Sequence, residues 1–324
     1  MRKINWGIIG LGNIAHSFSK GFFEVNNAKL LAASSLTKEK CENFQKKFNI
    51  KENYIFDEYD KIFSCKDIDI IYVTLPNNFH YEWIKKCLEN NKNLLIEKPA
   101  LIDSQNIVDF EKKIKDRKSF FSEGFMYRFH PQIKSILDVI KNGEIGQPIS
   151  METSFGINLL TKKKLFFFKK KKKIDPHSRL FNKNLGGGCI LDLGCYPSSF
   201  SLLISSLVEN INIKNFKIKN LHREIGETGV DIDAEAEINF DNKFVSKIKA
   251  SFKRDLGSHS VIYGTLGSIL IENTWHGGKV DIKIKNEKQI IFKKIKRNIF
   301  SYQIENISND LLDDKKEIRY PGMS

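Results

Sequence analysis

The first 122 residues alternate between short apolar runs and segments with apolar residues at helical spacing. The helical spacing is clearest at Ile14, Phe18 and Phe22, which recur every four residues. The apolar runs have the length of buried strands, and they occupy residues 4–9, 28–34, 68–75, 93–96 and 119–122. Strands that alternate with helices predict an α/β domain, a parallel sheet wound with helices on both faces.

After about residue 123 the pattern changes. A helix is predicted from Pro131 to Asn142, and a glycine-rich entry at Gly186–Gly188 opens another helix through Ser205. Apolar and polar residues then alternate at hairpin spacing through most of residues 210–296. This alternation favours an α+β domain with a large, mostly antiparallel open sheet and one solvated face. We therefore expect two domains, at 1–122 and 123–324.

The composition fits a folded, basic protein. The chain has 324 residues and a mass of 37.5 kDa, and its 41% of hydrophobic residues excludes wholesale disorder. The 53 Lys and Arg against 39 Asp and Glu give a net charge of +14, which raises nucleic acid as a partner. The excess is mostly Lys across the whole chain, so compositional bias explains it better. The dense tract Lys162–Lys173 is expected to be a solvated loop with mild attraction for anions.

The cysteines and the apolar stretches bear on the cellular compartment. The five cysteines, at positions 41, 65, 87, 189 and 195, form no CxxC pair, so we expect reduced, mostly buried thiols and no zinc site. We expect no stretch apolar for long enough to span a membrane. The apolar run near the N-terminus is too short and too rich in glycine for a signal sequence. These features predict a cytoplasmic protein.

The sequence Gly-Leu-Gly-Asn-Ile-Ala directly follows the first predicted strand and opens the first helix. This is the context of the GxGxxA dinucleotide fingerprint. Gly10 permits the tight turn, Gly12 lets the backbone approach a pyrophosphate, and Ala15 lets helix and strand pack closely. Asn13 and Ile14 begin the helix whose free N–H groups would face the phosphates. The alternative, a small-residue turn without a ligand, is less favoured here, so we expect a Rossmann domain that binds NAD or NADP.

The end of the second strand bears on which dinucleotide binds. An acidic residue there would hold the ribose of NAD and repel a 2′-phosphate. This chain instead has Ser34, Ser35 and Lys38 and no acid. Hydroxyls and an ammonium suit a 2′-phosphate, so NADP is favoured and NAD stays open.

Five further motifs make the chain similar to a known family. They are PNNFH at 76–80, LLIEKP at 94–99, GFMYRFHP at 124–131, LGGGCILDLGCYP at 185–197 and IYGTLGSILIE at 262–272. In this order and spacing the chain resembles the Gfo/Idh/MocA oxidoreductase family, in particular its branch of D-xylose and trans-1,2-dihydrobenzene-1,2-diol dehydrogenases. The resemblance implies an N-terminal Rossmann domain and a C-terminal domain whose open sheet forms a homodimer or homotetramer.

The resemblance also implies catalytic roles for three residues. Lys98 matches the family's active-site lysine, and Pro99 is expected to follow a cis peptide bond. Tyr196 matches the acid/base of the sugar and dihydrodiol branch, and Asp192 orients the substrate. A tyrosine titrates near pH 10 in isolation, and a nearby ammonium lowers the pKa of a phenol and stabilises a developing oxyanion. If the segment is helical, Asp192 and Tyr196 share one helix face. The alternatives are a surface turn at Lys98 and a core tyrosine.

Other residues receive weaker assignments from the resemblance. It places beside the cofactor Pro76, Asn77, His80, Glu97 and Lys98, and against the substrate Arg128, Arg179 and Asp192. His80 could instead cap or pack a helix, and Arg128, like His130, could form a buried structural pair. No metal is implied. Cys189 and Cys195, which flank Asp192, are expected to pack rather than react.

These inferences predict an NAD(P)-dependent dehydrogenase acting on the CH–OH groups of a cyclic sugar or a vicinal diol, of the 1.1.1 or 1.3.1 type. No nucleic acid and no membrane are expected as partners. An NAD-dependent glycoside hydrolase of the same fold is the main alternative. A nucleic-acid-binding module and a catalytically silent cofactor sensor are disfavoured by Lys98 and Tyr196. Relatives continue past the final YPGMS into a C-terminal helix, so we expect that helix to be missing here.

Overall fold

The computed structural model describes residues 2–115, 117–163, 169–285 and 287–316. The chain divides into two compact units, the first made of Met1–Phe129 with Lys296–Ser324 and the second of His130–Ile295. The predicted domain boundary, between residues 122 and 123, differs from this division in two ways. The structure keeps residues 123–129 in the first unit and returns the chain to that unit at residue 296.

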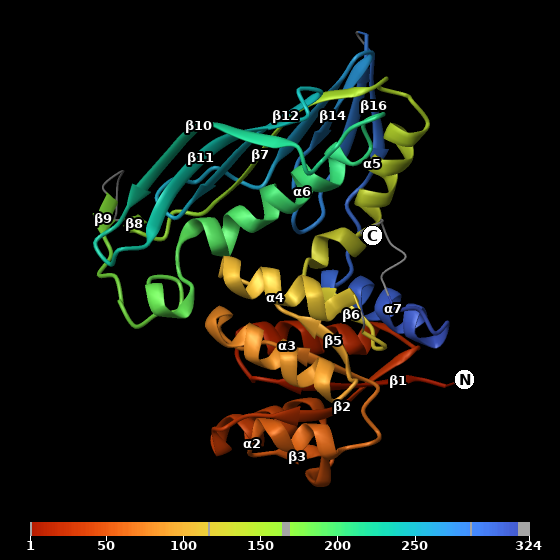
Figure 1. The fold of residues 1–324 in the computed structure, drawn as a ribbon, viewed down its shortest axis with the longest axis vertical. Helices are drawn as coiled ribbons and strands as arrows, with labels where there is room; N and C mark the ends of the chain where they lie inside the picture. The colour runs from red at the N-terminus through yellow and green to blue at the C-terminus, as the bar shows by residue number, and fades with distance from the viewer. Residues whose placement is uncertain (1, 116, 164–168, 286, 317–324) are drawn as a thin grey trace. The chain divides into compact units, whose positions relative to one another are not determined.

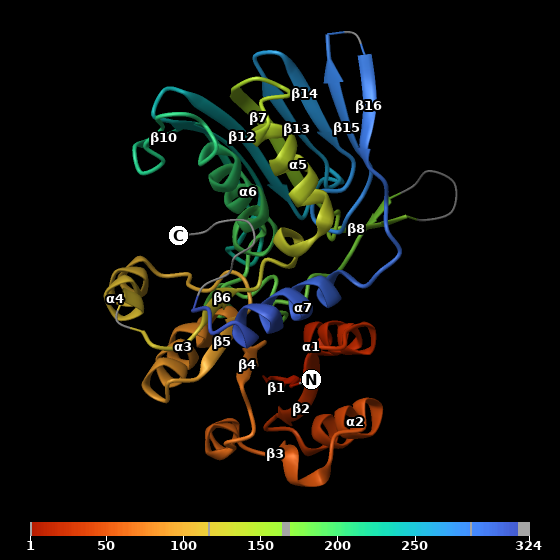
Figure 2. The same cartoon turned by 90° about the vertical axis from the view of Figure 1, so that its right-hand side faces the viewer.

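The first unit is built on a six-stranded parallel sheet with the order β3-β2-β1-β4-β5-β6 (Figures 1 and 2). The order reverses at β1 and β4, which is the doubly wound arrangement expected from alternating strands and helices. The strands are β1 (Ile4–Ile9), β2 (Ala28–Ser34), β3 (Ile55–Phe56), β4 (Ile70–Val73), β5 (Asn93–Ile96) and β6 (Phe121–Glu123). The two-residue β3 was not predicted, because so short a strand leaves no apolar run in the sequence.

Helices cover both faces of this sheet. On one face α3 packs its Trp83 and Cys87 into a core cluster with Ile71. On the other, the Phe18 ring of α1 lies 4.2 Å from the ring of Tyr72 and 5.7 Å from that of Phe300 in α7. The helices are α1 (Asn13–Ser19), α2 (Lys38–Phe48), α3 (His80–Glu89), α4 (Ser104–Lys115) and α7 (Ile299–Leu312), with 3₁₀ turns η1 (Lys20–Glu24), η2 (Glu52–Tyr54), η3 (Tyr59–Ser64), η4 (Asn77–Phe79) and η5 (Met126–Phe129).

Helix α7 belongs to the first unit although it lies at the far end of the chain. Its Ser308 hydroxyl accepts a hydrogen bond of 3.0 Å from the indole of Trp6 in β1. The sequence analysis did not predict this helix. Its signals were present, because the Asn298 side chain caps the first turn and Ile304 and Ile307 lie at helical spacing. The final YPGMS, and with it the expected missing helix, lies outside the described residues.

The second unit holds an eight-stranded sheet with the order β10-β11-β12-β7-β13-β14-β15-β16. All its pairs are antiparallel except β12 with β7, which confirms the large, mostly antiparallel sheet. The strands are β7 (Pro148–Gly156), β10 (Phe216–Ile225), β11 (Asp231–Phe240), β12 (Phe244–Ser251), β13 (Ser260–Gly264), β14 (Gly267–Ile271), β15 (Val280–Ile284) and β16 (Glu287–Phe292).

Helices α5 (Pro131–Lys141) and α6 (Cys195–Ser205) lie on the same face of this sheet (Figure 2). The buried hydroxyls of Ser201 in α6 and Ser246 in β12 are 2.6 Å apart, which fixes α6 against the sheet. A 3₁₀ turn, η6 (Lys183–Leu185), and a π-helical turn, η7 (Ile190–Gly194), lead into α6. The predicted glycine-rich entry to this helix is confirmed.

The lysine-rich tract is not wholly a loop. Its two ends pair as the short antiparallel strands β8 (Thr161–Lys163) and β9 (Lys169–Lys171), while residues 164–168 lie outside the described part of the chain. The expectation of a loop is therefore wrong for the ends of the tract.

One helical stretch in the described residues, Lys183–Ser205, is apolar and long enough by length and composition to cross a membrane. The expectation that no stretch reaches this measure is wrong, because the Leu, Ile, Phe and Cys residues of the segment raise its mean hydropathy although no long run is strictly apolar. About 61% of its most apolar window is buried inside the structure, as in a helix of a protein core. Its contacts with β7 and β12 are of that kind.

Candidate active site

The glycine loop has the geometry that a dinucleotide requires. Gly10 has a φ of +88°, and a Cβ there would lie 2.9 Å from Leu75 Cδ2. Its N–H donates to Ser34 O over 3.0 Å. Gly12 is the N-cap of α1, and a Cβ added to it would meet nothing within 4 Å. The tight turn and the open space before a helix N-terminus therefore fit a pyrophosphate, with Asn13 exposed and Ala15 buried as the fingerprint predicts.

The three residues predicted to receive a 2′-phosphate differ in their availability. Ser34 is fully buried, and its hydroxyl donates to Glu58 O over 3.0 Å. The buried Ser35 hydroxyl accepts the N–H of Thr37 over 3.3 Å. Lys38 is exposed, and its closest acidic contact is Glu42 at 3.9 Å. Lys38 is thus the one of the three whose charged group is free to meet a ligand.

Lys98 lies on a loop, directly after β5, that neighbouring strands hold in place. The Glu97 carboxylate accepts a hydrogen bond from the phenol of Tyr72 in β4, and its other oxygen accepts the N–H of Lys98 over 3.2 Å. Glu123, at the end of β6, accepts the N–H of Ala100 over 2.8 Å. Burial raises the pKa of Glu123 despite that hydrogen bond. The half-buried Lys98 therefore lies on a backbone that the side chains of Glu97 and Glu123 hold in place.

His80 also holds the Lys98 loop, through the carbonyl of Pro99. Its ring is fully buried, with Nδ1 at 2.9 Å from Pro99 O and Nε2 at 2.8 Å from Leu75 O. Burial lowers the pKa of His80, so the neutral ring donates to one of the two carbonyls. His80 thus joins the loops that follow β4 and β5 rather than offering a nitrogen to a ligand. The Lys98–Pro99 bond is cis, as the family resemblance implies.

Pro76 and Asn77 also follow β4. Pro76 is the N-cap of η4, and its carbonyl accepts the N–H of Phe79 over 2.9 Å. Both residues are half-buried. They lie at the same carboxyl edge of the sheet as Gly10 and Lys98, because all these residues follow the ends of parallel strands. The first unit therefore gathers most of the predicted cofactor-binding residues at one edge.

In the second unit the structure brings together two predicted substrate-binding residues. Arg179 Nη1 lies 3.0 Å from Asp192 Oδ1, with 56% of the arginine side chain exposed and only 13% of the aspartate. Asp192 lies in the π turn, and Tyr196 is the second residue of α6. The predicted four-residue spacing therefore runs through π geometry rather than an uninterrupted α-helix, and π turns are frequent at functional sites.

Tyr196 is 5% exposed and lies among aromatic rings of its own unit. Its ring centroid is 5.4 Å from that of Phe155 in β7, at 79°, and 5.6 Å from that of Trp275. The ring of His276 packs edge-on against Phe155 at 6.0 Å, and burial lowers the pKa of His276. The rings of Tyr196, Phe155 and Trp275 thus contact one another, and this packing excludes water from the ring of Tyr196.

The remaining predicted residues have structural surroundings. Arg128 is buried, with Nε donating to the Tyr127 hydroxyl over 3.3 Å and the guanidinium 5.5 Å from the ring of Phe125. His130 caps α5 by accepting the N–H of Gln132. Burial raises the pKa of the Cys189 thiol, in keeping with packing. None of the five cysteines forms a disulfide, and the burial of Cys41, Cys87 and Cys189 agrees with the prediction of mostly buried thiols.

The residues that support the site are not apparent from the sequence patterns. Tyr72 lies inside an apolar strand, and Glu123 follows a short one, so neither stands out in the sequence. Trp275 belongs to no motif, although the pair Gly277–Gly278 shortly after it indicates a turn.

Among the described residues, His222, Glu224 and Asp233 also place ligand atoms within 4.8 Å of one another. Lys253 and Arg254 already pair with those two carboxylates.

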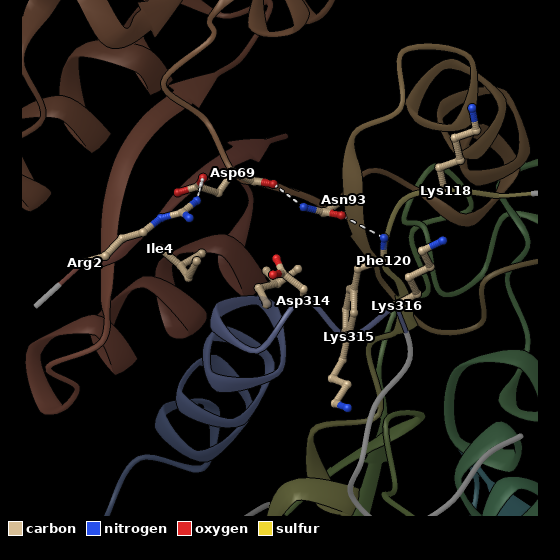
Figure 3. A pocket seen from close by; sticks show the side chains of 10 residues that line it. Arg2, Ile4, Asp69, Asn93, Lys118, Phe120, Asp314, Lys315 and Lys316 are labelled. Carbon is tan, nitrogen blue, oxygen red and sulfur yellow. Dashed lines mark hydrogen bonds and ion pairs between the residues drawn. The ribbon is translucent and has the colours of Figure 1, made fainter.

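A pocket of the first unit lies at the opposite edge of its sheet (Figure 3). Its lining includes residues at or just before the starts of β1, β4, β5 and β6, whereas the glycine loop follows the end of β1. Asn93 links two of these starts by donating to Asp69 O over 2.8 Å and accepting the N–H of Phe120 over 2.7 Å, and Arg2 pairs with Asp69. The pocket is therefore separate from the predicted cofactor edge.

Comparison with known families agrees with both units. A model described as "Oxidoreductase family, NAD-binding Rossmann fold" matches residues 4–125, and a model of the GFO/IDH/MocA C-terminal domain matches residues 133–270. The chain belongs to the Gfo/Idh/MocA oxidoreductase family. The Rossmann domain of this family binds NAD(P). In this chain that domain corresponds to the first unit, which carries the glycine loop.

Similar proteins match between 60% and 97% of the chain. A trans-1,2-dihydrobenzene-1,2-diol dehydrogenase from Xenopus tropicalis is 27% identical over 96% of this chain and 90% of its own length. A D-xylose 1-dehydrogenase (NADP(+)) from Hypocrea jecorina is 28% identical over 60% of this chain and 51% of its own. An aldose-aldose oxidoreductase from Caulobacter crescentus shares the fold with a TM-score of 0.81, at 19% identity over 97% of this chain and 91% of its own.

Proposed function

We propose that this Gfo/Idh/MocA oxidoreductase interconverts a hydroxyl and a carbonyl on a cyclic sugar or a vicinal diol, with NADP as the favoured cofactor. The observation that carries the proposal is the Lys98 loop, fixed from β4, β5 and β6 at the same sheet edge as the glycine loop. The relatives named as dihydrodiol and D-xylose dehydrogenases support the substrate class.

Four residues of the chain have separate roles in the proposed chemistry. Tyr196 removes the proton of the substrate hydroxyl, acting as general base in oxidation and as general acid in reduction. The Lys98 ammonium stabilises the negative charge that develops on the reacting oxygen. Asp192 accepts a hydrogen bond from a neighbouring substrate hydroxyl, and Arg179 holds that carboxylate in place at 3.0 Å.

The bound cofactor would supply the carbon that accepts or donates the hydride. Gly10, Gly12 and the first helical residues Asn13 and Ile14 would hold its pyrophosphate, because the space before the helix is open. Lys38 is the residue proposed to attract a 2′-phosphate. Ser34 and Ser35 contribute by shaping the end of β2, since both hydroxyls already bond within the protein.

The test is cofactor reduction at 340 nm on a panel of aldoses and vicinal diols, with NADP and NAD compared side by side. The proposal predicts turnover with at least one member of the panel and a higher kcat/KM with NADP. Glycoside cleavage without net cofactor reduction would contradict it and favour the hydrolase. An Arg179→Met variant should raise KM more than it lowers kcat, whereas Lys247→Met, which removes an exposed ion pair with Glu152 on the sheet, should change neither.

We also propose that the protein self-associates through the sheet of the second unit and works in the cytoplasm. Partly exposed apolar residues such as Tyr263, Leu270 and Ile290 on this sheet support the first point, because an open sheet that exposes apolar side chains suits a partner surface. Sedimentation at increasing concentration tests it, and a strictly monomeric protein would contradict it.

A further inference from the structure

Gln132 connects the start of α5 to a distant loop. It is the second residue of α5 and is fully buried. Its Nε2 donates to the carbonyls of Asn273 and Thr274, over 3.1 and 2.8 Å, and its Oε1 accepts the N–H of Gly278 over 2.9 Å. One amide thus satisfies two carbonyls and one N–H of the same loop, which only one orientation of that amide can do.

The loop that Gln132 holds, residues 273–278, is pressed against the start of α5. Gly277 has a φ of +85°, and a Cβ there would lie 2.4 Å from His130 Nε2. His130 in turn caps α5 by accepting the N–H of Gln132 over 3.2 Å. The loop also closes on itself, because the N–H of His276 donates to the Asn273 side chain over 3.1 Å. The start of α5 holds one side of this loop. Ser258 and Ser260 hold the loop as well, because the Thr274 N–H donates to Ser258 O over 2.7 Å and the Thr274 hydroxyl lies 2.7 Å from that of Ser260.

This loop places a large ring beside the candidate acid/base. Trp275 is fully buried, and its indole N–H donates to Ser154 O over 3.1 Å. Its ring centroid is 5.6 Å from that of Tyr196 and 6.0 Å from that of Phe155. A movement of the loop would carry Trp275 with it and change the packing around the phenol.

We propose that Gln132 is a positioning residue for Tyr196, acting through the 273–278 loop and the ring of Trp275. The inference deepens the proposed function and rests on it, because it takes Tyr196 as the acid/base. Gln132 makes no contact of its own with the reacting groups in this account. Gln132 instead helps to hold the ring of Trp275, against which the phenol of Tyr196 packs.

The test compares Gln132→Met, which keeps the volume and removes all three hydrogen bonds, with Gln303→Met. Gln303 is an equally buried glutamine in α7 of the first unit, so the pair controls for replacing a buried amide. Three quantities are measured: amide exchange of Gly278, the indole N–H resonance of Trp275 (assigned with Trp275→Phe), and kcat with saturating cofactor.

We expect Gln132→Met to speed exchange at Gly278 at least tenfold, to shift or broaden the Trp275 resonance, and to lower kcat about tenfold with cofactor affinity unchanged. Gln303→Met should do none of these. The kcat losses of Gln132→Met and Trp275→Phe should combine less than multiplicatively. If Gln132→Met does not fold, Gln132→Glu serves instead, since it keeps the acceptor for Gly278 and loses the two donors.

Faster exchange with an unchanged Trp275 resonance and an unchanged kcat would overturn the inference and leave Gln132 a merely structural residue. An unchanged exchange rate would overturn it as well. A wild-type protein without any turnover would instead contradict the proposed function. In that case the exchange rates and the Trp275 resonance still decide whether Gln132 sets the ring beside Tyr196.

Discussion

The imidazole of His80 lies 2.9 Å from the carbonyl oxygen of Pro99, the residue that follows Lys98. A buried ring at this place ties the Lys98 loop to the end of β4. His80→Leu removes the donor and leaves a buried carbonyl unsatisfied, which costs about 1–3 kcal/mol of the free energy of unfolding. We expect kcat/KM to fall at least tenfold, measured with the preferred substrate and cofactor. His80→Gln, which keeps a donor, should recover part of both losses, and an unchanged kcat/KM in His80→Leu would contradict this role.

The two glycines of the phosphate loop should separate stability from cofactor binding. Gly12 has an ordinary φ of −84°, and a Cβ there meets no atom. Gly12→Ala should therefore change the free energy of unfolding by no more than about 1 kcal/mol, yet weaken cofactor binding at least tenfold by filling the space for the pyrophosphate. Gly10→Ala should destabilise the fold itself, because its φ is +88° and the new Cβ would crowd Leu75. Calorimetric titration and thermal unfolding of both variants check this, and tight cofactor binding by Gly12→Ala would refute the assignment.

Cofactor preference should respond to Lys38 and not to Ser34. Lys38→Glu places a negative charge where a 2′-phosphate is proposed to lie, so the ratio of kcat/KM for NADP to that for NAD should fall at least tenfold. Ser34→Ala removes the hydrogen bond to Glu58 O and should cost about 1 kcal/mol of stability with the ratio unchanged. A ratio that is sensitive to Ser34 and insensitive to Lys38 would reverse this assignment.

Much of the fold was predictable from the sequence, because buried parallel strands need continuous apolar runs and half-exposed strands need alternation. The strands that hold Gly10 and Lys98 were found in this way. Helix α7 was not predicted, although the Asn298 cap and the helical spacing of its apolar residues are present in the sequence. The predicted elements stop at the last strand, before residue 297.

The supporting contacts of the site were not predictable. Tyr72 and Glu97 are 25 residues apart and meet only because β4 and β5 pair. The Ser34 hydroxyl likewise donates to the carbonyl of Glu58, which lies 24 residues further along the chain. Local patterns identify which residues belong to a strand, but the partner of a buried polar group is decided by tertiary packing.

The stability of the second unit should depend on pH through His130. Burial lowers the pKa of His130 to about 4, whereas an unfolded histidine titrates near 6.5. The unfolded chain therefore binds the proton first on acidification. The contribution of His130 to stability is full above pH 6.5 and is lost as the pH falls toward 4, by about 2 kcal/mol between pH 7 and pH 5. His130→Asn keeps an acceptor for the cap and removes the titration.

Urea unfolding at pH 7 and pH 5 measures this effect. The loss of unfolding free energy between the two values should be about 2 kcal/mol smaller in His130→Asn than in the wild type. His177→Asn, which changes an exposed histidine, should lose as much as the wild type. Equal losses in all three proteins would show that His130 takes up no more protons in the unfolded state than in the folded state between pH 7 and pH 5.

The central claim is that Lys98 and Tyr196 carry out the oxidation of a sugar or diol hydroxyl. It is tested most directly by cofactor reduction at 340 nm in wild type, Lys98→Met and Tyr196→Phe, with cofactor affinity measured on the same samples. The account predicts that each substitution lowers kcat at least a hundredfold, that Tyr196→Phe leaves the cofactor affinity within about threefold, and that both variants stay folded. Turnover retained by folded Lys98→Met or Tyr196→Phe at the wild-type rate would contradict it.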